Sequence, residues 1–187
     1  MQLWNISTVG LQFMSTTKSV SIVFYKGRGT LAEKLIRLWT KSPYSHCEFR
    51  RSDGLYHSND RFRFVSRTQL FEINSADWEM CEIILPGEII DRVERRQLRK
   101  NGTSYDWIGI VFSQVFRLGF HDKKRWFCSK SNADDLAYAY RLMQRSKDKR
   151  YDNYLEQLKV FETVSPQNCS PQKLYTLMQR TIHSRSC

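Results

Sequence analysis

Short apolar runs in the first half of the chain predict a set of β-strands. Residues 20–25 (VSIVFY) are apolar and rich in β-branched side chains, which is typical of a buried strand. The turn residues Ser52-Asp53-Gly54 separate two further runs and predict a β-hairpin. The predicted strands cover residues 20–25, 44–50, 55–58, 61–65 and 78–85.

A helical period is found between and after these strands. Thr30 can cap a helix that ends before Ser42-Pro43. Its apolar stripe consists of Leu31, Leu35, Ile36, Leu38 and Trp39. Residues 105–118 are apolar nearly all round, which predicts a buried helix. The other predicted helices cover 88–100 and 129–143, with two short helices within 151–181.

These elements predict an α+β domain in which a small antiparallel sheet packs against the helix that carries Cys128. At 187 residues, with 41% hydrophobic and 13% aromatic residues, the chain can bury a sizeable core. We expect a tail over 1–17 and a single domain over 18–187, with a helical portion from about 151. We expect no signal peptide, because residues 1–14 lack a basic start followed by a long apolar run. We also expect no membrane span, because 107–120 falls short of the roughly 20 apolar residues that a bilayer requires. A cytoplasmic location is therefore the default.

The net charge of +11 and the pI near 9.6 fit an anionic partner, such as nucleic acid, a phospholipid surface or an anionic polymer. The basic residues are spread along the chain, and no zinc-finger, RNP-like or homeodomain-like pattern is present. Composition alone therefore does not favour specific nucleic-acid binding.

The chain has five cysteines, an odd number without close spacing, which argues against a disulfide framework. The side chains that could bind zinc are those of His46, Cys47, His57, Cys81 and Cys128. The C-x-x-C and H-x-x-x-H spacings are missing, and adjacent strand residues point to opposite faces. We therefore expect no metal ion and no cofactor.

Cys128 lies where the helix predicted over 129–143 begins. A thiol is a good nucleophile only as a thiolate, and its pKa falls beside an imidazolium and at a helix N-terminus. The same helix start offers backbone N–H groups that can hold an oxyanion. His46, at the start of a predicted strand, is the candidate base for Cys128.

Two residues compete to orient His46. His57 lies across the predicted hairpin, where facing side chains are roughly 5 Å apart between Cβ atoms. Glu48 shares the strand face of His46, but two residues along a strand span roughly 6–7 Å. We favour His57 and keep Glu48 as the alternative.

The order of these motifs resembles that of a known family. A strand with Lys26-Gly27-Arg28-Gly29, a helix, Ser42-Pro43-Tyr44-Ser45-His46 and then Trp126-Phe127-Cys128-Ser129 resemble the YiiX-like branch of circularly permuted NlpC-type papain-like cysteine hydrolases. Tyr105-Asp106-Trp107 and the segment from Ser170 to Tyr175 also look like this family. The order of parts is similar to that of lecithin:retinol acyltransferase-like enzymes as well.

The resemblance implies Cys128 as nucleophile, His46 as base and His57 as the third residue. Tyr44, Glu48, Ser129 and Lys130 are secondary candidates. Lys130 stands where the family often has glutamate, and a cation there could lower the pKa of Cys128 or favour an anionic substrate.

The implied activity is cleavage or transfer of an acyl group at an amide or ester bond. The substrate would be a peptide, a peptidoglycan stem or an acyl lipid. An acyl-lipid substrate would bring an anionic membrane surface as a partner. The alternative is a non-catalytic binding or effector module on the same fold, with an anionic partner. Nothing in the sequence decides the oligomeric state.

Overall fold

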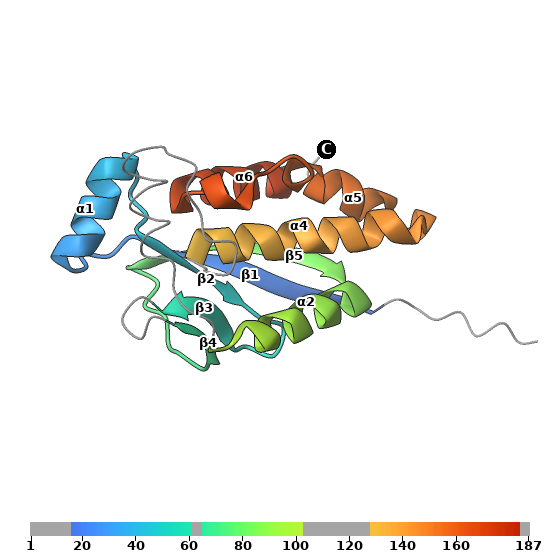
Figure 1. Ribbon diagram of the computed structural model, residues 1–187, viewed down its shortest axis with the longest axis horizontal. Coiled ribbons are helices and arrows are strands. Elements are labelled where there is room, and N and C mark those ends of the chain that lie inside the picture. Colours follow the sequence, from blue (N-terminus) through green and yellow to red (C-terminus); the bar gives the residue numbers. More distant parts are fainter. Residues whose placement is uncertain (1–15, 61–64, 103–127, 184–187) are drawn as a thin grey trace, which may run out of the picture.

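The computed structural model describes residues 16–60, 65–102 and 128–183. Within these residues, a five-stranded antiparallel sheet packs against α-helices, of which there are five (Figure 1). The strands are β1 (Thr17–Tyr25), β2 (His46–Arg50), β3 (Tyr56–Asp60), β4 (Val65–Gln69) and β5 (Trp78–Pro86). The α-helices are α1 (Leu31–Thr40), α2 (Gly87–Lys100), α4 (Cys128–Ser146), α5 (Asp152–Leu158) and α6 (Pro171–His183). Short 3₁₀ helices cover Lys149–Tyr151, Lys159–Phe161 and Pro166–Asn168.

The predicted α+β class is confirmed, and most predicted elements are found close to their expected positions. Of the strand predicted over 61–65, only Val65 lies within the described residues, where it begins β4. Residues 61–64, the helix predicted over 105–118 and most of the predicted tail lie outside the described residues.

The strand order is β4-β3-β2-β1-β5, so β1 lies between β2 and β5. One face of β1 carries Val20, Ile22 and Phe24, which are buried and form the core together with residues of α4 such as Leu136 and Met143. α4 lies along the sheet, with α2 on one side and α5 and α6 on the other (Figure 1). Burial of this apolar face is the main force that holds α4 in place.

The position of β2 follows from its register with β1. Phe24 pairs with Cys47, and the last residue of β1, Tyr25, pairs with His46. Alternation along β2 then places Cys47 on the core face with Phe24, whereas His46 belongs to the other set of positions. His46 therefore lies at the end of the sheet where β1 finishes and β2 begins.

Polar contacts fix the position of α4 relative to α2. Lys100 Nζ lies 2.6 Å from Asp135 Oδ1, and Gln97 Nε2 donates to Asp135 Oδ2 at 3.0 Å. Asp135 has no exposed surface, and Lys100 is 6% exposed. Buried ions in such a pair need each other, because a lone charge in this position would be strongly destabilising.

Three leucines of the apolar stripe predicted for α1 do not pack into the core. Leu31, Leu35 and Leu38 are 74%, 56% and 76% exposed. The helix instead begins with a capping box, in which Thr30 and Glu33 each accept a hydrogen bond from the backbone N–H of the other. Its helical state therefore depends more on this local cap than on burial of its leucines.

Candidate active site

Cys128 is the first residue of α4, and it lies against the start of β2. Its sulfur is hydrogen-bonded by the side chain and by the backbone N–H of Cys47, and by the side chain of His46. Cys128 is 5% exposed, so the residue is almost wholly buried. The structure thus brings together the predicted nucleophile and the predicted base, which are far apart in sequence.

The imidazole of His46 lies between Cys128 and Glu48. Its Nε2 is 3.2 Å from Glu48 Oε1 and 3.1 Å from Ser58 Oγ. Because these two oxygens occupy Nε2, we assign Nδ1 as the nitrogen that faces the sulfur. The ring also meets Trp78 edge-on, with 6.3 Å between ring centroids. These contacts hold the imidazole in one orientation.

The two groups shift each other's pKa toward an ion pair. Hydrogen bonds from Cys47, together with the charge and hydrogen bond of His46, hold the pKa of the Cys128 thiol well below its ordinary value, although burial opposes this. Burial would lower the pKa of His46, but Cys128 and then Glu48 raise it to about 10. At neutral pH the site therefore holds a thiolate beside an imidazolium.

Glu48 is in turn held by Arg67. Arg67 Nη2 donates to Glu48 Oε1 at 3.0 Å. Glu48 is 2% exposed, so burial would raise the pKa of its carboxyl, but His46 and Arg67 together lower it. The carboxylate therefore remains charged and available to His46.

His57 does not orient His46, contrary to our expectation. It pairs with Phe49 across β2 and β3, which places it on the core face of the sheet. Its Nδ1 bonds Thr68 Oγ1 at 3.0 Å, and burial lowers its pKa to about 4. The contact expected from His57 is made by Glu48, whose side chain is long enough to span the two-residue step along β2. Backbone spacing alone made Glu48 the less favoured of the two candidates, because it leaves out the length of the side chain.

The secondary candidates have mostly structural contacts. Tyr44 donates its hydroxyl to Glu79 Oε2 at 2.7 Å and packs against Tyr175, with 4.6 Å between ring centroids. Ser129 donates to the carbonyl of Cys169, which ties the start of α4 to the C-terminal helices. Lys130 is 3% exposed, in the first turn of α4.

Three residues of the site were not predicted from the sequence: Cys47 as a partner of the sulfur, Ser58 and Arg67. The strand register could have identified two of them. Ser58 pairs with Arg67 in β3 and β4, and continuing the pairing of Phe49 with His57 places Ser58 opposite Glu48. Glu48, Ser58 and Arg67 therefore form one row across three strands, on the face to which His46 belongs.

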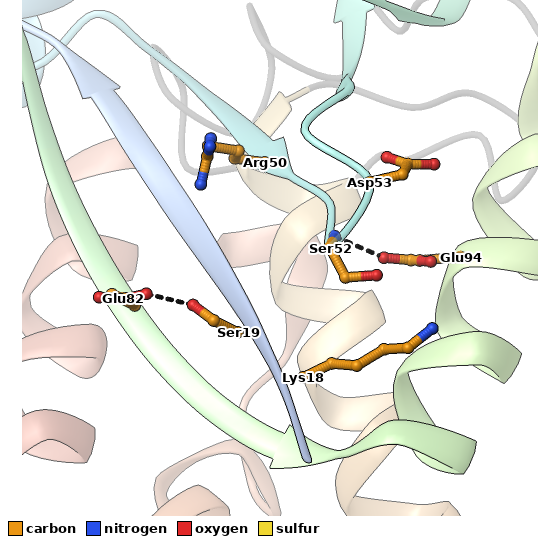
Figure 2. A pocket seen from close by; sticks show the side chains of 7 residues that line it. All are labelled: Lys18, Ser19, Arg50, Ser52, Asp53, Glu82 and Glu94. Carbon is orange, nitrogen blue, oxygen red and sulfur yellow. Dashed lines mark hydrogen bonds between the residues drawn. The ribbon is translucent and has the colours of Figure 1, made fainter. Parts of the chain in front are cut away.

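An open hollow of about 600 Å³ lies away from this site (Figure 2). It is found beside the first residues of β1, whereas His46 pairs with the last one. Its polar lining is already engaged, since Glu94 accepts from the Ser52 backbone N–H at 2.7 Å and Ser19 donates to Glu82. The lining residues are Lys18, Ser19, Arg50, Ser52, Asp53, Glu82 and Glu94.

Within residues 16–60, 65–102 and 128–183, no group of three or more His, Cys, Asp or Glu side chains is arranged to hold a metal ion. In the same part of the chain, every helix is too short or too polar to cross a bilayer. Comparison with protein-family models, curated proteins and solved structures finds no match.

Proposed function

We propose that this chain is a cysteine hydrolase or acyltransferase with a circularly permuted papain-like arrangement. The observation that carries the proposal is the chain of contacts from Cys128 to His46 to Glu48. A thiol, an imidazole and a carboxylate in this order are the parts of a nucleophile, a base and an orienting group. The resemblance of the sequence motifs to YiiX-like enzymes supports the same reading.

In the proposed reaction, the Cys128 thiolate attacks the carbonyl carbon of an amide or ester. The carbonyl oxygen becomes an oxyanion, which N–H groups at the start of α4 are placed to stabilise. The His46 imidazolium then protonates the leaving amine or alcohol as the bond to carbon breaks, and an acyl-enzyme remains on Cys128. Water or an acceptor alcohol or amine next attacks this thioester, with neutral His46 removing its proton.

Glu48, rather than His57, is the third member in this proposal. Its carboxylate fixes the ring of His46 and stabilises the imidazolium, with Arg67 holding the carboxylate in place. His57 serves the packing of the sheet against α4. A pair of variants separates the two roles. Glu48→Gln removes the charge next to His46, whereas His57→Asn keeps a group that can bond Thr68.

The first test is alkylation by iodoacetamide near pH 6, with mass mapping of each cysteine. An ordinary thiol with a pKa near 8.5 is almost wholly protonated at this pH, so it reacts slowly. We expect fast labelling confined to Cys128, lost in His46→Ala, reduced in Glu48→Gln and retained in His57→Asn. Cys81→Ala is the matched control, because Cys81 is a buried thiol of β5 and the hydrogen bond recorded for its sulfur comes from Gln179.

The second test traps the covalent intermediate. An activated p-nitrophenyl ester should leave an acyl group on Cys128, seen by intact mass and removed by hydroxylamine. Fast labelling without any acyl adduct, over a panel of ester and peptide substrates, would move the assignment to a binding module that keeps a reactive thiol. Slow labelling spread over several cysteines would refute the activated site itself.

A further inference from the structure

A second thiol lies against the proposed nucleophile. Cys47 follows His46 in β2 and is fully buried on the core face. Both its side chain and its backbone N–H contact the sulfur of Cys128. One helical turn further along α4, Asn132 Nδ2 donates to Cys47 Sγ at 3.3 Å. Cys47 is therefore held beneath the first turn of α4, with its sulfur next to that of Cys128.

The two sulfurs differ in protonation. Burial, and the neighbouring Cys128, raise the pKa of Cys47 well above the ordinary value, so Cys47 remains a thiol. The pKa of Cys128 is lowered well below it, so Cys128 is the thiolate. Peroxides oxidise thiolates far faster than thiols, so an oxidant that reaches the pair reacts first at Cys128.

We propose that Cys128 and Cys47 form a disulfide under peroxide, with Cys47 as the resolving thiol, so that oxidation reversibly blocks the site. In the first step, the Cys128 thiolate attacks hydrogen peroxide and becomes a sulfenic acid, with hydroxide released. The Cys47 sulfur then attacks the sulfenic sulfur. An S–S bond forms, the S–O bond breaks, and the Cys47 proton leaves with the hydroxyl as water. Two electrons pass from the two thiols to one peroxide.

The disulfide has direct consequences for the site. An S–S bond of about 2.05 Å draws the two sulfurs much closer than a hydrogen bond does. It also removes the thiolate that makes the ion pair with His46, so the nucleophile is masked. A dithiol reductant adds two electrons and restores both thiols. Without a resolving thiol, the sulfenic acid instead proceeds to sulfinic acid, which such reductants do not reverse.

Cys169 is the rival resolving thiol. Its carbonyl accepts a hydrogen bond from Ser129, so it too lies near the start of α4. Its sulfur, however, faces the carbonyl of Ser170 at 3.9 Å. Cys47, by contrast, is hydrogen-bonded to Cys128 through both its side chain and its backbone. The geometry therefore favours Cys47 over Cys169.

The test treats the full chain with a several-fold molar excess of hydrogen peroxide at neutral pH, then blocks free thiols and maps cysteines by mass spectrometry. We expect a peptide pair joined through Cys47 and Cys128, with loss of Cys128 labelling that dithiothreitol restores almost completely. In Cys47→Ser and Cys47→Ala, the same treatment should add two oxygens to Cys128, and labelling should not return. Cys169→Ala is the matched control and should behave as the wild type.

Three results would overturn the proposal: a Cys128–Cys169 disulfide, full recovery of labelling in both folded Cys47 variants, or no oxidation of Cys128. Circular dichroism establishes which variants are folded, and the serine variant keeps a polar group next to Cys128 in case the alanine variant is unstable. The disulfide readout needs no turnover. A disulfide without any acyl adduct would contradict the proposed enzyme and support the redox pair. An acyl adduct without a disulfide would support the enzyme and contradict the redox pair.

Discussion

A stability measurement can test whether His57 is a buried neutral ring that serves packing and does not act in the reaction. Its side chain has no exposed surface, and burial lowers its pKa from 6.5 to about 4. Among the neighbouring charges, Asp135 and Glu48 favour the imidazolium, whereas Lys100 and Arg51 oppose it. The native protein therefore holds this ring neutral at pH values at which the unfolded chain has already bound a proton.

The sign of the effect follows from that difference. Between pH 6.5 and pH 4 the unfolded state binds more protons than the native state at this residue, so the free energy of unfolding falls as the pH falls. Each pKa unit corresponds to about 1.4 kcal/mol, so the difference between 6.5 and 4 corresponds to about 3.5 kcal/mol in all. From pH 7 to pH 5, the loss caused by His57 should be roughly 2 kcal/mol.

Urea unfolding of the wild type and of His57→Asn at pH 7 and pH 5 measures this quantity. Carboxyl groups also titrate in this range, but they do so in both proteins and cancel in the comparison. We expect the variant to be less stable at pH 7, because it loses core packing, and to lose roughly 2 kcal/mol less than the wild type on acidification. His183→Asn, at an exposed position in α6, is the matched control and should follow the wild type. An identical loss in His57→Asn and the wild type would refute the buried neutral ring.

Three further substitutions test other parts of the structure. Asp135→Asn replaces the nearest carboxylate of buried Lys100 by a neutral amide and leaves Asp134, at 3.7 Å, as a more distant one, so it should cost about 3 kcal/mol in urea unfolding. The double variant with Lys100→Met should recover most of that loss, and an equal loss in the single and double variants would contradict the ion pair. Thr30→Ala removes the cap of α1 and should weaken that helix by about 1 kcal/mol, read as faster amide exchange confined to α1. Arg67→Met removes a contact of the Glu48 carboxylate and should slow iodoacetamide labelling of Cys128 near pH 6, less than Glu48→Gln does; labelling as fast as in the wild type would remove Arg67 from the site.

The order of elements was largely predictable from sequence because hydrophobic periods report which faces are buried. The VSIVFY run, the hairpin turn at Gly54 and the cap at Thr30 each gave a local signal, and the corresponding elements are found. The contact of His46 with Cys128 was also expected, since a strand start and a helix start were paired by chemistry and motif order.

The third residue was not predictable in the same way. Whether His57 lies on the face of His46 depends on the register of β2 and β3, because a shift of one residue moves a side chain to the other face. The turn alone does not determine that register. The placement of Cys47 beneath α4 was missed for a related reason: alternation along β2 gives it a face, but only the packing of α4 shows which atoms it meets there.

The order in which the two halves of this site occur along the chain has a consequence for synthesis. The strand with His46 and Glu48 precedes the helix with Cys128 by about eighty residues, so it leaves the ribosome first. A partly made chain thus contains the proposed base without the proposed nucleophile. Before Cys128 meets β2, we expect its thiol to have ordinary reactivity. The pKa of Cys128 falls only when α4 has packed against β2, because His46 and Cys47 of β2 lower it. Labelling of Cys128 at low pH therefore reports that β2 and α4 have come together, and we expect no activated thiolate in a chain that has not reached this stage.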